Sequence, residues 1–123
     1  MNGNCIFLDT NIVLYLLNGN SDLVTILNKM QLFVSVITEI ELLGYREISK
    51  NDKIKIKNFL SDCTIISIQE EIKDICIEIK QKEKIKTPDA IIAASAIALE
   101  IPLITSDKGF EKIEKLDLFL YKI

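Results

Sequence analysis

The sequence predicts an α/β protein of three layers, in which helices cover both faces of a central and mostly parallel sheet. Short apolar runs, rich in β-branched residues, alternate along the chain with segments whose apolar residues recur at helical spacing. Parallel strands need long crossover connections, and helices usually provide them. The chain has 123 residues, the size of one domain, and neither a linker nor a repeat divides it. We therefore predict a single α/β/α domain over residues 1–123.

Five short apolar segments are predicted to be the strands. The first, Cys5–Leu8, is continuously apolar, as expected for a parallel strand that is buried on both faces. The others have the β-branched and aromatic composition of strands. They are residues 32–36, 64–68, 102–105 and 118–121.

The segments between these strands carry the signals of helices. Residues 12–17 are apolar on every side and predict a buried helix, and residues 18–22 supply a turn and an N-cap for the next helix. Thr87-Pro88-Asp89 combines a hydroxyl cap, a proline at the first helical position and an acid in the first turn. The other predicted helices are 23–30, one that begins near Ile37, 49–62, 72–79, 90–99 and 109–115.

The composition limits the chemistry that the protein can perform. The chain contains no histidine, which excludes Ser-His-Asp and Cys-His catalysis, histidine-ligated zinc and imidazole acid–base chemistry. Hydrolytic chemistry must therefore use carboxylates, hydroxyls, lysines or a bound metal. The net charge of −3 argues against strong non-specific binding of nucleic acid, although it leaves local basic patches open.

The cysteines and the amino terminus predict a soluble cytoplasmic protein. Cys5, Cys63 and Cys76 are far apart and lie in apolar segments, so we expect buried reduced thiols rather than disulfides or a zinc site. Residues 1–4 lack the charge and apolar core of a signal peptide. No apolar run approaches the ~20 residues that span a bilayer, so we expect no membrane association.

Asp9 lies at the end of the first predicted strand, and a carboxylate there is costly to bury without a partner. One interpretation is that Asp9 or Thr10 caps the following helix. The other interpretation is that Asp9 belongs to a binding site, because ligands of parallel sheets bind outside the carboxyl ends of the strands. Three further acids are expected at this edge: Glu41 early in the helix after the second strand, Asp89 at a helix start, and Asp107 after the strand 102–105.

Four acids in one cleft repel one another unless a cation compensates them, and oxygen ligands suit a hard ion such as Mg²⁺ or Mn²⁺. We therefore predict that Asp9, Glu41, Asp89 and Asp107 form a metal site. Thr10, Asn11, Thr105 and Ser106 are predicted to support it by orienting carboxylates or bound waters. Each acid taken alone has a structural explanation, such as capping or interaction with a helix dipole, and only their joint placement favours the metal.

Four stretches of the chain resemble the acidic motifs of PIN domains, most closely those of VapC-type toxins from bacterial toxin–antitoxin systems. They occur in the order that the family shows and extend from Phe7 to Phe110. They are Phe7-Leu8-Asp9-Thr10-Asn11-Ile12, Ser35-Val36-Ile37-Thr38-Glu39-Ile40-Glu41-Leu42, Thr87-Pro88-Asp89-Ala90-Ile91-Ile92-Ala93-Ala94-Ser95-Ala96 and Leu103-Ile104-Thr105-Ser106-Asp107-Lys108-Gly109-Phe110. Each motif alone is weak, whereas the ordered set is specific.

The resemblance implies a PIN-like fold and a Mg²⁺- or Mn²⁺-dependent endoribonuclease, usually a homodimer that a cognate antitoxin holds inactive. By position, Asp9, Glu41, Asp89 and Asp107 match the acids of the family, and Asn11 and Thr105 match polar positions beside them. Glu39 competes with Glu41 for the second motif, although the flanking residues favour Glu41. Gly44 comes one residue sooner after this acid than the family pattern has it.

The predicted mechanism is hydrolysis of an RNA phosphodiester by water that a metal activates. Lysines and an arginine around the cleft are candidates to hold the RNA backbone, although such charges are more often only solvated helix faces. They are Arg46, Lys50, Lys84, Lys86 and Lys108. For the homodimer, the apolar residues of 12–23 and of the helix 23–30 are candidates to face the second copy.

Two other functions fit parts of the pattern. An aspartate after an apolar first strand is also the nucleophile of haloacid dehalogenase-type phosphatases, but that family places a second aspartate where this chain has Asn11. The alternative from another class is a receiver or RNA-binding module that keeps the fold without catalysis. The presence of acids at all four motif positions argues against it.

Overall fold

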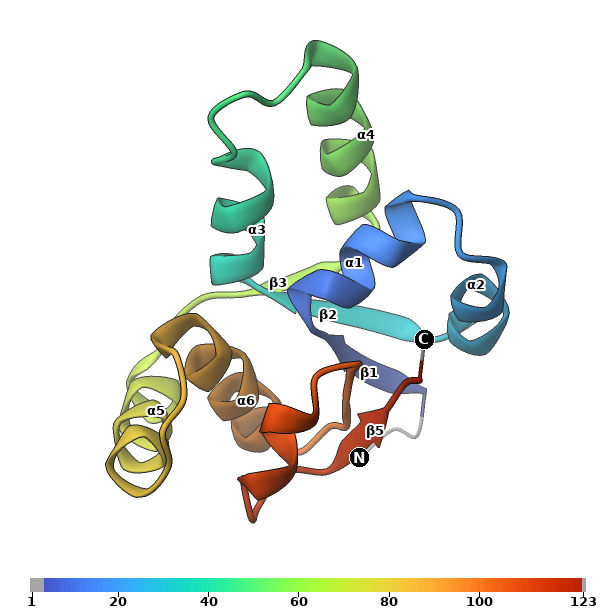
Figure 1. The fold of residues 1–123 in the computed structure, drawn as a ribbon. Helices are drawn as coiled ribbons and strands as arrows, with labels where there is room; N and C mark the ends of the chain where they lie inside the picture. The colour runs from blue at the N-terminus through green and yellow to red at the C-terminus, as the bar shows by residue number, and fades with distance from the viewer. Residues whose placement is uncertain (1–3, 123) are drawn as a thin grey trace.

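Residues 4–122, which the computed structural model describes, contain a five-stranded sheet with helices on both faces (Figure 1). The strands are β1 (Cys5–Leu8), β2 (Gln31–Ser35), β3 (Thr64–Ile66), β4 (Leu103–Thr105) and β5 (Leu118–Leu120). Their order across the sheet is β3-β2-β1-β4-β5, and every neighbouring pair is parallel. The predicted α/β class is therefore confirmed, and the described sheet is wholly rather than mostly parallel.

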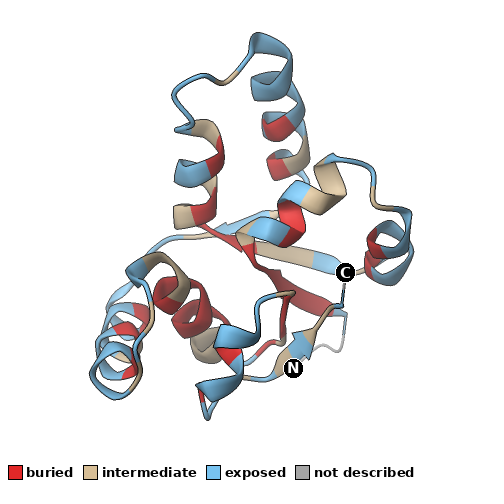
Figure 2. Cartoon of the chain, viewed as in Figure 1, coloured by how far each residue is buried: buried red, intermediate tan, exposed pale blue. Residues whose placement is uncertain are grey.

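Two groups of helices form the outer layers. One face carries α1 (Thr10–Leu17), α2 (Ser21–Leu27), α3 (Val36–Leu43) and α4 (Lys50–Ser61). The other carries α5 (Glu70–Lys82), α6 (Thr87–Leu99) and the 3-10 helix η1 (Lys108–Lys112). Each group packs its apolar side chains against the sheet in a core of its own. Figure 2 shows where the buried residues lie along the strands and helices. The two cores confirm the predicted three-layer arrangement.

β1 is the central strand, and its side chains alternate between the two cores. Ile6 and Leu8 point into the core of α1–α4, whereas Cys5 and Phe7 point into the core of α5 and α6. This alternation is the period of two that a strand imposes, and here both sides are apolar because both faces are covered. The strand therefore needs no polar residue until its end at Asp9.

The loop after α1 divides residues 12–23 into two helices. α1 ends at Leu17, and Gly19 has a φ of 85°, a left-handed conformation that glycine adopts without strain. Asn20 then caps α2 by accepting a hydrogen bond of 3.0 Å from the backbone N–H of Leu23. The turn and cap predicted in residues 18–22 are thus confirmed.

Several predicted helix starts and ends are wrong, and the helix predicted over 23–30 is α2, which ends at Leu27. Thr87 is the first residue of α6 rather than its cap, so Pro88 takes the second helical position, and Lys86 occupies the cap position without a side-chain hydrogen bond. The segment predicted as a helix over 109–115 is the 3-10 helix η1, which starts one residue earlier and ends at Lys112. Asp107 caps it and fixes its start.

The three cysteines are free thiols, as predicted, with Cys5 and Cys76 buried and Cys63 partly buried. Burial raises the pKa of the Cys63 thiol to about 11 and also raises the pKa of Cys76. Both thiols therefore stay protonated and unreactive near neutral pH. Within residues 4–122, no helix is long and apolar enough to cross a membrane.

Candidate active site

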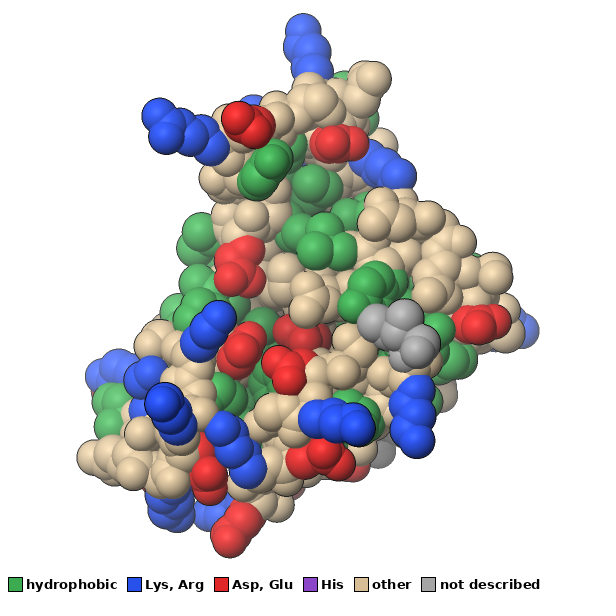
Figure 3. Space-filling view, in the orientation of Figure 1, with side chains coloured by type: hydrophobic (Ala, Val, Ile, Leu, Met, Phe, Trp, Pro, Cys, Tyr) green, Lys and Arg blue, Asp and Glu red, His purple; other side chains and the backbone are tan. Residues whose placement is uncertain are grey.

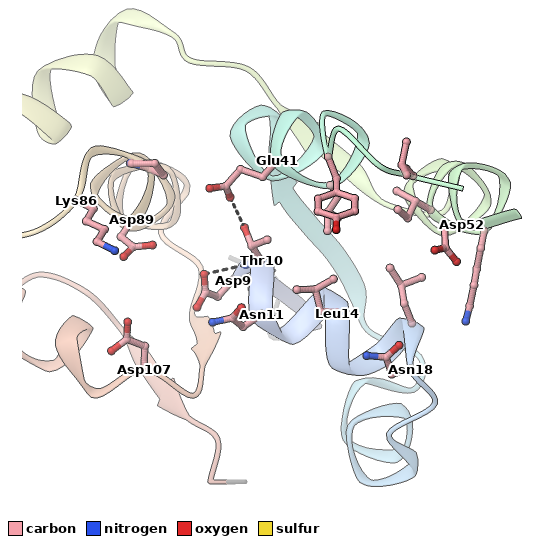
Figure 4. A pocket seen from close by; sticks show the side chains of 17 residues that line it. Asp9, Thr10, Asn11, Leu14, Asn18, Glu41, Asp52, Lys86, Asp89 and Asp107 are labelled. Atoms are coloured by element: carbon pink, nitrogen blue, oxygen red, sulfur yellow. Dashed lines mark hydrogen bonds between the residues drawn. The ribbon is translucent and has the colours of Figure 1, made fainter. Parts of the chain in front are cut away.

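The four predicted acids line one cleft of about 720 Å³ (Figure 4). They come from four different segments of the chain. Asp9 follows β1, Glu41 lies in the second turn of α3, Asp89 in the first turn of α6, and Asp107 follows β4. Because the sheet is parallel, the carboxyl ends of its strands meet at one edge, where such folds place their ligands. The register of β1 on β4, which pairs Leu8 with Ile104, sets Asp9 beside Thr105.

Asp9 is the most buried of these acids, with 4% of its surface exposed. Its Oδ1 accepts a hydrogen bond of 2.8 Å from the backbone N–H of Thr10, so Asp9 is the N-cap of α1. Its Oδ2 accepts a second bond of 2.6 Å from the Thr105 hydroxyl. Asp9 therefore caps a helix and faces the cleft at once, so the two interpretations of the sequence do not exclude each other.

Thr105 connects Asp9 with Asp107. Its side chain is fully buried, and its Oγ1 accepts a hydrogen bond of 3.1 Å from the backbone N–H of Asp107 while it donates to Asp9. Asp107 is exposed, and its Oδ1 accepts a bond of 2.8 Å from the backbone N–H of Gly109. One hydroxyl thus fixes the relative positions of two segments that carry acids.

Glu41 is oriented by the Thr10 hydroxyl, which also contacts a second threonine. Thr10 Oγ1 donates a hydrogen bond of 2.9 Å to Glu41 Oε1 and lies 2.9 Å from Thr38 Oγ1. Thr38 was not among the predicted site residues. Its spacing of three residues from Glu41 on α3 is the signal that could have indicated it, because residues so spaced share a helix face.

The pKa values of two of the four acids in the cleft, Asp9 and Asp89, are raised. Burial raises the pKa of Asp89, and the negative charges of Asp9, Asp107 and Glu41 raise it further, while Lys86 lowers it. Burial also raises the pKa of Asp9, against the lowering effect of its hydrogen bonds from Thr105 and Thr10. The acids are thus close enough for their charges to raise the pKa values of Asp9 and Asp89.

The other predicted residues differ in how near they lie to this cleft. Asn11 lines it, and Thr10 both lines it and contacts two acids. The Ser106 hydroxyl instead lies 3.5 Å from the Tyr15 hydroxyl. Of the two glutamates that compete for the second motif, Glu41 rather than Glu39 is among the lining side chains.

The cleft extends beyond the acids to an apolar end that the sequence analysis missed. Tyr45 and Ile48 of the α3–α4 connection line this end together with Leu14 of α1. Asp52 and Lys55 of α4 lie beside them, as Figure 4 shows for Asp52. None of these residues belongs to a motif, so no signal in the sequence pointed to them.

The donor set suits a hard divalent cation. Carboxylate oxygens are the ligands that Mg²⁺ and Mn²⁺ prefer, and this cleft is lined by four carboxylates. Within residues 4–122, no three acidic or cysteine side chains are gathered tightly enough to enclose an ion. Mg²⁺ does not require this, because it usually keeps several waters and binds through one or two carboxylates. The residues of the cleft therefore fit such an ion.

The fold and this acidic cleft define a PIN domain, and the comparison with protein families agrees. Residues 6–116 match the family model described as PIN domain. The chain therefore belongs to the PIN-domain family. No curated protein matches the chain.

Within the family, the chain is similar to solved structures of toxin–antitoxin complexes. One, from Klebsiella pneumoniae, has a chain with 30% identity and a TM-score of 0.81, with 96% of this chain and 99% of that chain covered. VapBC2 from Rickettsia felis, bound to a promoter DNA fragment, has 26% identity and a TM-score of 0.84, again with 96% of this chain and 99% of that chain covered. VapBC-1 from nontypeable Haemophilus influenzae has 26% identity and a TM-score of 0.76, with 94% of this chain and 97% of that chain covered. The predicted assignment to the VapC type is thus confirmed, and the phosphatase alternative is wrong.

Proposed function

We propose that this protein is a metal-dependent endoribonuclease that hydrolyses RNA phosphodiester bonds and acts as the toxin of a toxin–antitoxin pair. One observation carries the proposal: Asp9, Glu41, Asp89 and Asp107, from four segments of the chain, line one cleft at the carboxyl edge of a parallel sheet. The family assignment supports it, because the chain has the PIN fold over residues 6–116. We treat residues 1–123 as a single nuclease domain.

Asp9, Glu41, Asp89 and Asp107 would surround Mg²⁺ or Mn²⁺, with one or two of the carboxylates bound to the ion directly and the others through its waters. A bound ion of this kind lowers the pKa of water and neutralises charge on the leaving oxygen. The chain itself contributes placement: Thr105 and Thr10 fix the Asp9 carboxylate, and Thr10 also fixes Glu41. One of these acids would accept a proton from the attacking water.

Lysines on one side of the cleft are suited to the RNA backbone. Figure 3 shows a group of acidic side chains on one face with Lys and Arg side chains around it. Lys86 lines the cleft beside Asp89, and the Lys112 ammonium donates to the carbonyl of Lys84, which joins the α5–α6 loop to η1. Arg46, Lys50, Lys84 and Lys108 are exposed but are not cleft-lining residues. We therefore assign the scissile phosphate to the side of Lys86.

Single-stranded or looped RNA is the favoured substrate. Its backbone can bend so that one phosphate enters a cleft, whereas a duplex presents a rigid surface. The bending brings the phosphate to the acids while the lysines at the rim contact its neighbours.

The partners follow from the relatives. The similar structures from Klebsiella, Rickettsia and Haemophilus are toxin–antitoxin complexes, which supports a cognate antitoxin as the binding partner of this chain. We also propose that the protein works as a homodimer in the cytoplasm.

A nuclease assay on purified protein tests the proposal. We expect cleavage of unstructured RNA with Mg²⁺ or Mn²⁺ and none in excess EDTA. Asp9→Ala and Asp89→Ala should each remove nearly all activity, and the double variant should lose little more, because residues that act as one unit are not additive. Asp74→Asn, an exposed acid on α5 outside the cleft, is the control and should keep full activity.

The same assay separates the alternative function. A catalytically silent RNA-binding module would bind the RNA, with or without metal, and leave it intact. Intact RNA under every metal condition would therefore overturn the enzyme and favour that module. Cleavage that persists in both alanine variants and in EDTA would place the activity elsewhere or in a contaminant.

A further inference from the structure

Three hydrogen-bonded side chains, those of Thr38, Thr10 and Glu41, connect α1 with α3 at the cleft, and we call this series the relay. Thr38 Oγ1 lies 2.9 Å from Thr10 Oγ1, and Thr10 Oγ1 lies 2.9 Å from Glu41 Oε1. Thr38 and Glu41 are in the same helix, whereas Thr10 is the first residue of α1 and approaches from the neighbouring helix. Figure 4 shows the last contact, in which the Glu41 side chain bends towards Thr10.

The direction of these hydrogen bonds follows from the number of protons. An ionised carboxylate can only accept, so Thr10 must donate its single hydroxyl proton to Glu41. Thr10 then has only lone pairs left for its contact with Thr38, and Thr38 must be the donor in that contact. The relay therefore runs from Thr38 through Thr10 to Glu41. A hydroxyl that accepts one hydrogen bond while donating another polarises further, which strengthens the bond to the carboxylate.

The burial of the three residues decreases along the relay from Thr38 to Glu41. Glu41 is exposed, Thr10 is half-buried, and Thr38 has 0% of its surface exposed. Water can compete for the Glu41 carboxylate, but it cannot replace Thr38 as the donor to Thr10 without entering the core. A glutamate on a helix surface is otherwise a flexible side chain that loses much rotamer freedom when it is held. The buried end of the relay is thus the part that fixes its geometry.

We propose that Thr38 is a positioning residue of the site, which holds the Thr10 hydroxyl so that Thr10 keeps the Glu41 carboxylate in the cleft. The inference rests on the proposed function, because a held carboxylate serves the site only if it binds the cation. Thr38 touches neither the cation nor RNA. It acts through Thr10, and its loss weakens cation binding rather than removing it.

Three substitutions and one control isolate this role. Thr38→Val keeps the volume and removes the donor, Thr38→Ser keeps the donor, and Thr10→Val removes the middle of the relay. Ser95→Ala is the matched control: Ser95 is also a buried hydroxyl on a helix, and it donates 2.7 Å to the Ile91 carbonyl on α6, away from these threonines. If Thr38→Val does not fold, Thr38→Ala replaces it in every measurement.

The first measurement needs no metal. NMR relaxation of the Glu41 side-chain methylenes should report an ordered side chain in the wild type, Thr38→Ser and Ser95→Ala, and a mobile one in Thr38→Val and Thr10→Val. A Glu41 side chain that is already mobile in the wild type, or equally ordered in Thr38→Val, overturns the proposal.

The second measurement is the affinity for Mn²⁺, followed by electron paramagnetic resonance. Loss of a residue that orients a metal ligand weakens binding by about 10- to 100-fold. We expect the lower end, about 10-fold, for Thr10→Val, and a smaller loss for Thr38→Val because it acts one step further away. In a Glu41→Ala background, Thr38→Val should cause no further loss of Mn²⁺ affinity, because Thr38 affects the ion only by positioning Glu41. A full additional loss in that background overturns the proposal.

The two measurements separate this inference from the proposed function. If the wild type binds no Mn²⁺, the proposal of a metal-dependent nuclease is wrong. The order of the Glu41 side chain still decides whether Thr38 positions it. Normal Mn²⁺ binding with unchanged Glu41 order and affinity in Thr38→Val leaves the nuclease standing and removes Thr38 from its machinery.

Discussion

Thr105 donates a hydrogen bond of 2.6 Å to Asp9 although 96 residues separate them in the sequence. Asp9 and Thr105 stand at the ends of β1 and β4, which are neighbours in the sheet. Both side chains are almost completely excluded from solvent. The contact therefore ties the order of the strands directly to the geometry of the acidic cleft.

Removing the Thr105 hydroxyl should destabilise the protein. Thr105→Val leaves the buried Asp9 carboxylate without one of its two donors, and a lost hydrogen bond to a charged group lowers the free energy of unfolding by about 1.5–3 kcal/mol. Urea unfolding at about pH 7 measures the change, with Thr105→Ser as the control that keeps the hydroxyl. Equal stability of the valine and serine variants would contradict the role assigned to this bond.

The contribution of Asp9 and Asp89 to the stability of the metal-free protein should fall as the pH rises above the ordinary aspartate pKa of 3.8. Burial raises the pKa values of Asp9 and Asp89, so the folded state holds their protons more tightly than the unfolded state does. Their contribution to stability is complete below 3.8 and is lost as the pH rises through the raised values.

Asp9→Asn tests this pH dependence, because it removes the buried charge and keeps an acceptor for Thr105. In EDTA at about pH 7, the free energy of unfolding of Asp9→Asn should exceed that of the wild type, and the difference should shrink towards about pH 4. Asp74→Asn, exposed on α5, should follow the wild type at every pH. If the free energy of unfolding at neutral pH is larger for the wild type than for Asp9→Asn, the predicted pH dependence is wrong.

Added Mn²⁺ or Mg²⁺ should stabilise the folded protein, because an ion that binds only the folded state shifts the unfolding equilibrium. The gain is about 2.7 kcal/mol when the free ion exceeds its dissociation constant 100-fold. Asp9→Asn and Asp89→Asn should lose most of the rise in melting temperature, while Asp74→Asn keeps it. An undiminished rise in both cleft variants would place the ion elsewhere.

The protein should sediment as a dimer at about micromolar concentration, and we expect the contact at the edge of the sheet beside β3. Exposed isoleucines occur there on α3 and β3, among them Ile40 with 57% and Ile65 with 37% of their surface exposed. The sequence suggests residues 12–30 instead, where Ile12, Val13, Leu23 and Leu27 face the core. Leu14, Val24 and Ile26 of this stretch are exposed.

Matched variants distinguish the two surfaces. Ile40→Lys should shift the protein towards monomer. Val24→Lys should not, although Val24 is similarly exposed at 54%, because it belongs to α2, which lies apart from α3 and β3 in Figure 1. Dissociation by the Val24 variant alone would restore the suggestion made from the sequence, and a monomeric wild type would contradict the homodimer.

The position of Asp9 could be predicted from the sequence because both of its determinants are local. A continuous apolar run ending in an acid marks the end of a buried strand, and the helical residues that follow mark a cap. The start of α6 was predicted for similar reasons and was wrong only in assigning the cap to Thr87, because the helix begins one residue before the proline. Such errors of a residue do not move Asp89 out of the first turn.

The relay through Thr38 and the apolar end of the cleft could not be predicted in this way. Thr38 meets Thr10 across 28 residues, and their contact depends on how closely α1 and α3 pack. Tyr45 and Ile48 reach the cleft because the α3–α4 connection places them there, and no periodic pattern encodes the path of that connection.

By itself, the sequence determined the alternation of strands and helices, the parallel sheet that this implies, and the edge at which the four acids gather. These follow from hydrophobic periods of two and 3.6 residues, which the backbone geometry imposes on any chain. Only the tertiary structure decided which atoms touch: Thr105 on Asp9, Thr10 on Glu41, and burial that raises the pKa of Asp89. Hydrogen bonds and desolvation change steeply over fractions of an ångström, and distances on that scale are set by the packing of the whole core.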